Sequence, residues 1–278
     1  MLKTKITFLL FFTLNFSLIS QENTTKKISD KGKLFIYWGW NRANYSNSDI
    51  HLTGNNYDFT LKNVVAYDRP TAFTFAYFNP VKITIPQTNF RIGYFLNDHY
   101  TVSIGVDHMK YVVKSYQTVK INGEINAGTP FDRIYNNDTI LLSHDFFQFE
   151  HTDGLNYINA EFKRVDDIGH FIGMNDKDFQ LSITEGFGGG ILFPKTNSKL
   201  FNQERWDEFH VSGWGVSAGV GLNLTFFKYF FIQSDLKYGY INMPDIRTTF
   251  NPDDKASQNF TFFEKTIVFG VKFNISKG

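Results

Sequence analysis

Residues 211–226 read VSGWGVSAGVGLNLTF, and large apolar side chains alternate with small or polar ones along the stretch. A period of two residues places successive side chains on opposite faces of a β-strand. The two faces therefore differ in chemistry: one carries Trp214, Val216, Ala218, Val220, Leu222, Leu224 and Phe226, and the other carries Gly213, Gly215, Ser217, Gly219, Gly221, Asn223 and Thr225. A transmembrane strand needs about 9–11 residues, so this stretch is long enough to cross a bilayer.

Similar alternation along the chain predicts further strands, and the gaps between them differ greatly in length. We expect strands near 33–45, 87–97, 100–113, 152–165, 178–193, 208–226, 230–245 and 260–275. Long gaps alternate with short ones, as in barrels whose periplasmic turns are short and whose extracellular loops are long. The sequence therefore predicts an all-β fold, an antiparallel up-and-down transmembrane β-barrel of about eight strands.

Two of the gaps, 46–86 and 114–151, are too long to be simple connectors. Each contains a candidate for a short extra hairpin, at Tyr57 to Val65 and at Tyr116 to Ile125. If these hairpins extended into the wall, the barrel would have ten strands instead of eight.

The polar face of the predicted strands indicates what the barrel encloses. A secreted soluble barrel would turn its apolar face inward and a Lys- and Glu-rich face toward water. Here the polar positions are small or carry charges of mixed sign, namely Arg91, Asp107, Glu161, Lys163, Asp235, Lys237, Glu264 and Lys272. Side chains just fill a barrel of about eight strands, and unpaired buried charges are costly, so we expect these ions to pair inside. The high aromatic content, with 32 Phe, 14 Tyr and 4 Trp, suits the aromatic girdles of a membrane barrel.

The first twenty residues predict export. Lys3 and Lys5 precede an apolar run that ends at Ile19, followed by Ser20 and a polar residue, the pattern of a signal peptide. We therefore expect a signal peptide at 1–20, a periplasmic lead-in at 21–32 and an outer-membrane barrel domain at 33–278. Without the two signal-peptide lysines, 26 basic residues face 27 acidic ones, which argues against a nucleic-acid partner. The chain has no cysteine, so a disulfide framework and a thiolate metal site are excluded.

In architecture, residues 33 to 275 resemble the small eight-stranded outer-membrane barrels, a class that includes the OmpA-type membrane domain and the lipid A-modifying barrels. The segment FFEKTIVFGVKF at 262–273 is similar to the terminal strand that the barrel-assembly machinery reads. It departs from the usual pattern because Asn274 to Gly278 follow it in place of a terminal aromatic residue. The resemblance implies insertion by that machinery, and contact with outer-membrane lipid and lipopolysaccharide.

The candidate site lies at the predicted outer rim. Glu150, His151 and Asp153 end one strand, and His108 ends its neighbour. A His beside a carboxylate is the core of a general-base arrangement, and the lipid A-modifying barrels place theirs at this level. In the resemblance to the deacylases, however, the serine nucleophile expected two residues after His151 is replaced by Asp153. The spacing of these residues also matches no recognised zinc pattern, and we predict neither a metal nor a cofactor.

These observations predict a non-enzymatic outer-membrane protein that acts through its long loops, with a structural, surface-binding or accessory role. Envelope-complex subunits are then possible partners. The first alternative is an enzyme that modifies the acyl chains of lipid A or phospholipid and uses the rim His and carboxylates. A further alternative is a small pore, which a filled lumen would disfavour.

Overall fold

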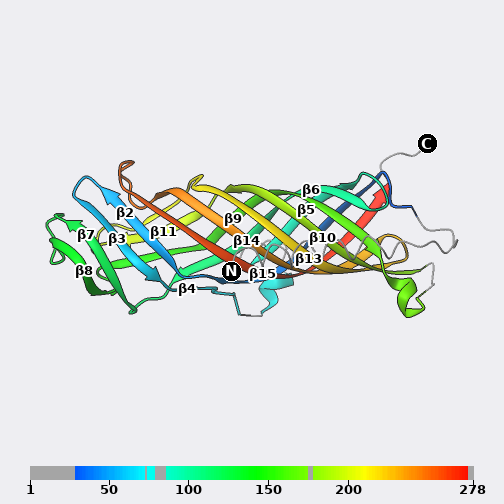
Figure 1. The fold of residues 1–278 in the computed structure, drawn as a ribbon, viewed down its shortest axis with the longest axis horizontal. Coiled ribbons are helices and arrows are strands. Elements are labelled where there is room, and N and C mark those ends of the chain that lie inside the picture. Colours follow the sequence, from blue (N-terminus) through cyan, green and yellow to red (C-terminus); the bar gives the residue numbers. More distant parts are fainter. Residues whose placement is uncertain (1–28, 73, 79–85, 175–177, 275–278) are drawn as a thin grey trace, which may run out of the picture.

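The computed structural model describes residues 29–72, 74–78, 86–174 and 178–274, and β-strands dominate it (Figure 1). Within these residues, eight strands form a closed antiparallel ring, in which β1 pairs with β15. In order around the ring they are β1 (Lys33–Tyr45), β5 (Thr88–Phe95), β6 (Tyr100–Val113), β9 (Phe147–Asp167), β10 (Phe179–Leu192), β13 (Gly213–Phe226), β14 (Phe230–Arg247) and β15 (Lys255–Asn274). The predicted barrel class is confirmed, with eight strands in the ring and not ten.

The barrel is prolonged at one end by additional strands, which we call the extension. These are β2 (Ser48–Gly54), β3 (Tyr57–Val64), β4 (Ala66–Tyr67), β7 (Thr118–Ile125), β8 (Arg133–Leu141), β11 (Lys195–Leu200) and β12 (Trp206–Phe209). On one side, β2, β3, β7 and β8 continue the sheet outward from the upper half of β15. On the other side, β11 pairs with the start of β9, and β12 pairs with β11. The extension lies at the left of Figure 1, where β7 and β8 reach furthest.

The hairpin candidates in the long gaps are strands, but they do not widen the ring. The segment at 57–64 forms β3 and the segment at 118–125 forms β7, and the two pair with each other. The strand pair β11 and β12 lies in a region that we had expected to be mostly a connector. The upper parts of β9 and β15 also begin five residues earlier than predicted, because extension strands pair with them there.

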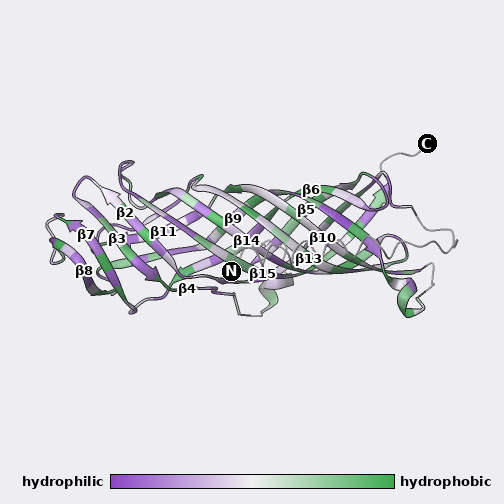
Figure 2. Ribbon diagram, viewed as in Figure 1, coloured by the Kyte–Doolittle hydropathy of each residue, from purple (hydrophilic) through white to green (hydrophobic). Residues whose placement is uncertain are grey.

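The side-chain directions in β13 match the prediction. Val220 and Leu222 point outward with 48% and 52% of their surface exposed, while Ser217, Gly221 and Thr225 are buried on the lumenal side. The same alternation of hydropathy is visible along the barrel strands in Figure 2. An outward apolar face on a closed barrel is the pattern of a wall in contact with lipid.

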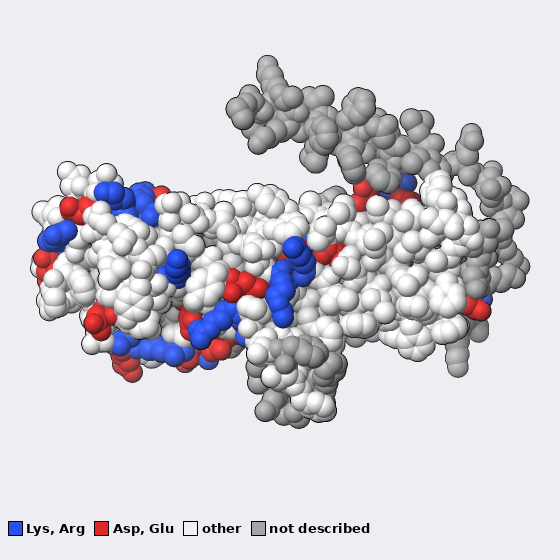
Figure 3. Space-filling model, turned by 90° about the horizontal axis from the view of Figure 1, so that it is seen from below, with Lys and Arg blue, Asp and Glu red and all other residues white. Residues whose placement is uncertain are grey.

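Together the outward apolar residues form a belt around the barrel half of the molecule. Its exposed members include Phe90, Ile92, Val102, Ile104, Phe187, Ile191, Trp214, Val216, Val220, Leu222, Ile232, Leu236, Ile267, Phe269 and Phe273. On the face shown in Figure 3, the barrel half is a nearly uncharged band, whereas acidic and basic side chains cover the extension. The belt therefore marks the membrane-spanning part, and the extension stands outside it.

The short connections identify the periplasmic end. The turns that join β5 to β6 and β13 to β14 lie there, together with the short 3₁₀ helix η3 (Gly169–Ile172) between β9 and β10. Asp98 of the first turn accepts hydrogen bonds from Ser29 Oγ and from the amides of Asp30 and Lys31, at 2.7, 2.8 and 3.0 Å. The end of the predicted lead-in is thus docked on the barrel rim, whereas the predicted signal peptide lies outside the described residues. Of the helices in the described ranges, none has the length and apolarity to cross a bilayer.

Candidate functional site: the lumen, the extension core and the outer rim

The lumen is filled at mid-height by a network of charged side chains. Lys237 Nζ lies 2.5 Å from Asp107, 2.8 Å from Glu161 and 3.6 Å from Glu264. Arg91 Nη2 lies 3.2 Å from Glu161 and 3.6 Å from Asp107. These five residues come from five different strands and are almost completely buried. Their ion pairs therefore connect the strands to one another across the lumen of the barrel.

Neutral side chains complete the network. Asn89 Nδ2 donates to Asp107 at 2.7 Å and to Glu264 at 2.9 Å, and Arg91 donates to the hydroxyl of Tyr37 at 3.0 Å. Lys163 adds contacts of 3.3 Å to both Glu161 and Asp235. Buried charges are costly unless partners and hydrogen bonds satisfy them. The network gives every charged member an ion-pair partner, and one oxygen each of Glu161 and Glu264 is left without a hydrogen bond. The predicted pairing of the lumenal charges is confirmed.

A cavity of ≈ 40 Å³ lies in the lumen between this network and the periplasmic end. Its lining includes Arg91 and Lys163 on the inner side, and Phe35, Phe95 and Phe231 toward the mouth. Beside the cavity, the Asp30 carboxylate binds Lys33 at 2.7 Å and Lys272 at 2.5 Å. The cavity has space for a few water molecules only, since one water needs roughly 10–15 Å³ of such a void.

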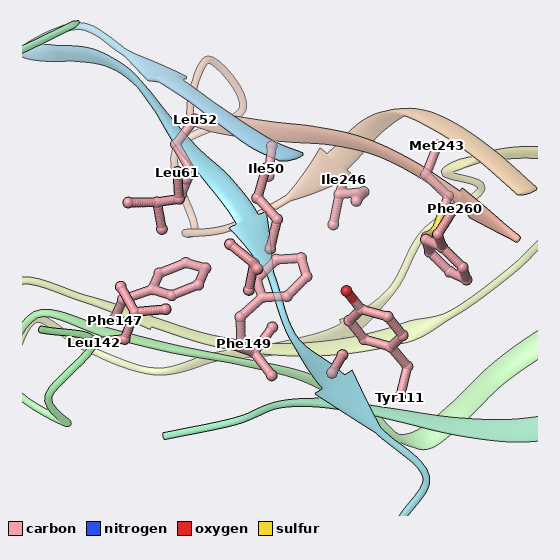
Figure 4. Packing of buried hydrophobic residues seen from close by; sticks show 14 of the residues in the cluster. Ile50, Leu52, Leu61, Tyr111, Leu142, Phe147, Phe149, Met243, Ile246 and Phe260 are labelled. Atoms are coloured by element: carbon pink, nitrogen blue, oxygen red, sulfur yellow. The ribbon is translucent and has the colours of Figure 1, made fainter. Parts of the chain in front are cut away.

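Above the belt, the interior of the extension is an apolar core. Figure 4 shows side chains from opposite walls converging there, and its labelled members are Ile50, Leu52, Leu61, Tyr111, Leu142, Phe147, Phe149, Met243, Ile246 and Phe260. At the outer end of this core, Phe59, Phe146 and Phe201 pack with ring centroids 5.9–6.0 Å apart. Two levels of the interior are thus filled: charged side chains fill the lumen at the level of the membrane, and apolar side chains fill the extension above it.

The candidate rim residues are divided between the two faces of the wall. His151 points inward and is completely buried, whereas its neighbour Glu150 points outward. The ring nitrogens of His151 face Thr196 Oγ1 at 3.1 Å and Gln258 Nε2 at 3.4 Å, and its ring packs on Tyr111 and Phe149. Burial lowers the pKa of His151 to about 3, so the ring is neutral at physiological pH.

The other three candidate residues lie on the outer surface. Glu150 contacts Arg69 at 3.5 Å and accepts a hydrogen bond from Asn197 at 3.0 Å. Asp153 pairs with Lys195 at 3.4 Å. His108 Nδ1 lies 2.7 Å from the side-chain oxygen of Asn156, its partner across the ladder. Each acidic candidate thus has a partner other than a histidine.

A bulge separates these positions. Tyr111 pairs with His151 and Met109 pairs with Leu155, so residues 152–154 of β9 lie opposite the single residue Lys110 of β6. Gly154 sits in this bulge with φ 135°, a conformation that favours glycine. The structure therefore brings no carboxylate to His151. The His–carboxylate contacts at this end of the molecule involve other residues: His210 Nε2 lies 3.0 Å from Asp245, and His51 Nε2 lies 2.8 Å from Asp58. Within the described residues, no three His, Asp or Glu side chains are grouped in a way that could hold a metal ion.

Sequence reasoning missed two features of the outer surface. One is the short 3₁₀ helix η1 (Phe75–Phe78), which lies against the outside of β1, where the Tyr77 ring packs 5.7 Å from Trp40. The other is a group of basic residues at the upper edge of the belt, on β1, β6 and β15. The aromatic run at 73–78 was the available signal for the first, and the basic residue that follows an outward apolar series on β1 and on β15 was the signal for the second.

Comparison with known proteins yields structural likenesses only. No family model matches the chain, and neither does any curated protein. Among solved structures, the outer membrane protein OprG from Pseudomonas aeruginosa is 13% identical with a TM-score of 0.41, over 88% of this chain and 97% of that one. AlkL, solved in lipid bilayers, is 11% identical with a TM-score of 0.41, over 94% and 99%. Ail of Yersinia pestis is 12% identical with a TM-score of 0.32, over 87% and 99%.

These identities and superpositions are too low to carry an argument about function. The assignment of the chain as an outer-membrane barrel rests on its own closed ring and its outward apolar belt. A closed antiparallel barrel satisfies every backbone group within the lipid, and such barrels belong to outer membranes.

Proposed function

We propose that this chain is a non-enzymatic outer-membrane barrel that holds a β-structured extension at the cell surface, where the extension binds a partner or shields the surface. The single observation that supports this most is the doubly filled interior. A barrel that is occupied by ion pairs within the membrane and by an apolar core above it offers no path for a solute. Its accessible chemistry therefore lies on the outside of the extension.

The outer surface of the extension has features suited to contact with another molecule. Strands β8 and β12 each pair along one side only within the described residues, so the sheet ends in two free edges. On β8, the side chain of Ile134 is 76% exposed, and Arg133 lies over the Tyr135 ring at 4.4 Å. Free strand edges and exposed apolar side chains are common contact sites for protein partners. A subunit of an envelope complex would fit this surface.

The two alternatives receive less support. A pore would need an open lumen. A lipid acyl-modifying enzyme would need His151 to act as a base on a substrate outside the wall, but this ring is buried, neutral and without a carboxylate.

Single-cysteine labelling tests the arrangement on which the proposal depends, since the chain has no natural cysteine. Cysteine placed at Asn56 in the β2–β3 turn, or at Asp253 in the β14–β15 loop, should react with a membrane-impermeant maleimide on intact cells. Cysteine placed at Lys228 in a periplasmic turn should react only after the outer membrane is permeabilised. Labelling of Lys228→Cys on intact cells, with the extension sites protected, would refute the proposed orientation.

Mass spectrometry of the cell lipids separates the proposal from the enzymatic alternative. Lipid A and phospholipids from cells with and without the protein should give the same mass spectra. A changed acyl pattern that disappears in His151→Gln would establish the enzymatic alternative instead.

A further inference from the structure

The upper edge of the apolar belt carries a localised group of basic side chains. It consists of Arg42 on β1, Lys110 on β6, Lys265 on β15 and Arg69 in the link between β4 and η1, and we call it the basic edge. In Figure 3, basic side chains gather at the middle of the molecule, where the uncharged band meets the charged extension. The basic edge is distinct from the lumenal network, because these side chains are on the outside of the wall.

The ladder places two of these residues side by side. Arg42 and Lys265 are cross-strand partners, and both side chains are exposed. Toward the periplasm, the outward positions of β1 are Trp40, Trp38, Ile36 and Leu34, and those of β15 are Ile267, Phe269, Val271 and Phe273. Arg42 and Lys265 therefore follow directly on two uninterrupted apolar series, at the upper edge of the belt.

The other two basic residues, Lys110 and Arg69, lie on the side of the group that faces β6. The Tyr45 hydroxyl donates to the carbonyl of Lys110 at 2.7 Å, which holds the upper part of β1 against β6. Burial lowers the pKa of Lys110, and the charges of Arg69 and Arg42 lower it further, while Asp153 and Asp68 oppose them. Lys110, Arg69 and Arg42 thus lie close enough to influence one another, and Lys265 lies beside Arg42 in the ladder.

The acidic residues near the basic edge engage only part of it. Glu150 is engaged by Arg69, and Asp153 is engaged by Lys195. Asp68 is turned toward the wall, where it accepts hydrogen bonds from the amide of Ala43 at 3.1 Å and from Gln87 at 2.6 Å. Within the described part of the chain, neither Arg42 nor Lys265 forms a salt bridge with a carboxylate.

Aromatic groups beside the basic edge suit the same environment. Tyr77 of η1 accepts a hydrogen bond from Arg42 Nη2 at 3.1 Å and packs on Trp40. Phe75, in the same short helix, is 83% exposed on the outside of the barrel. Aromatic rings at the level of the headgroups are typical of membrane interfaces.

From this placement we infer that the basic edge is a binding site for the phosphate groups of an outer-leaflet lipid, whose acyl chains lie on the apolar series of β1 and β15 below it. Clusters of Lys and Arg at the membrane surface recognise anionic headgroups, and Arg binds phosphate oxygens in a bidentate manner. The inference does not depend on what the extension binds.

The experiment uses the full chain, purified in a neutral detergent and titrated with bisphosphorylated lipid A while native mass spectrometry counts the bound lipid. We expect the wild type to retain the lipid and Arg42→Gln/Lys265→Gln to bind it about tenfold or more weakly. The variant Arg42→Lys/Lys265→Arg should restore most of the binding. The matched control is Lys62→Gln/Lys120→Gln, which removes the same charge from exposed positions on β3 and β7.

Four results would overturn the inference. They are wild-type binding by the double Gln variant, equal weakening by the Lys62/Lys120 control, equal binding of dephosphorylated lipid A, and displacement of the lipid by millimolar inorganic phosphate. The last result would indicate a site for a free anion. The shift in gel mobility on heating establishes that each variant is folded before its binding is measured.

Discussion

At the scale of single residues, the lumenal network makes the barrel sensitive to the loss of Lys237. Replacing it with Met leaves Asp107 and Glu161 buried without their nearest cation, and we expect a loss of about 3–5 kcal/mol in the free energy of unfolding. Urea unfolding in lipid vesicles, followed by tryptophan fluorescence, measures it. The control is Lys265→Met, the same substitution on the adjacent strand but facing outward, where we expect a change below about 1 kcal/mol. Equal losses in the two variants would contradict the assignment of the network as a structural plug.

A second residue-scale prediction concerns a glycine that faces an aromatic ring. A Cβ on Gly93 would lie 2.1 Å from the ring of Phe35, whereas a Cβ on Gly189 would meet its nearest atom at 3.5 Å. We therefore expect Gly93→Ala to destabilise the barrel by about 1–3 kcal/mol through overpacking, and Gly189→Ala to be tolerated. The same unfolding assay applies. A stable Gly93→Ala variant would show that Phe35 can leave its position at no cost.

A third prediction at this scale concerns acid. Since the pKa of His151 in the folded protein is about 3 and its ordinary value is 6.5, the unfolded chain binds the additional proton in between. The stabilisation from the neutral ring is therefore complete above pH 6.5 and is lost as the pH falls toward 3. Between pH 7 and pH 5, we expect the wild type to lose about 2 kcal/mol more than His151→Gln. Parallel pH dependences in the two proteins would contradict the burial of a neutral ring.

At the scale of elements, the extension core should unfold separately from the barrel. Phe59 of β3 packs against Phe146 and Phe201, so Phe59→Ala opens a cavity that should cost about 3–5 kcal/mol. We expect trypsin to cleave the extension of this variant on intact cells while the membrane-embedded strands remain protected. The control, Phe187→Ala, removes a ring of the belt that is 65% exposed and should leave the extension resistant.

The elements also show what the sequence could and could not predict. Period two was enough to place Val220 outward and Gly221 inward, and it required that Glu150 and His151 point to opposite faces, a consequence that argues against a His–Glu pair. The strand β11 was missed because Thr196, Asn197 and Ser198 are all buried and polar, so no alternation marks it. Their burial depends on partners distant in sequence, such as His151 for Thr196 and Thr248 for Ser198. The bulge at 152–154 was missed for a similar reason, because it depends on how β9 pairs with β6, a strand distant in sequence.

At the scale of the whole molecule, we expect the filled interior to prevent ion conduction. Reconstituted in planar bilayers, the wild type should show no discrete conductance steps, because the ionic network and the apolar core lie in series along one axis. Stable unitary currents from the pure protein would refute this prediction and support the pore. A matched set of variants truncates the side chains of the ionic network, of the apolar core, or of both. Only the variant in which both are truncated should conduct ions.

The continuity of the long strands has a mechanical consequence. Strand β9 has 21 residues and β15 has 20, roughly twice the number that a bilayer requires. The bulge at 152–154 interrupts the pairing of β9 with β6 where β9 leaves the belt, whereas β15 pairs with β1 in unbroken register over the whole of β1. A force applied at the cell surface is therefore transmitted along the strands and loads the hydrogen bonds between them in shear, so that many bonds resist together instead of opening one after another. We therefore expect the molecule to resist extension as a unit, so that a force on a ligand bound at the outer end of the extension would be distributed over all the barrel strands.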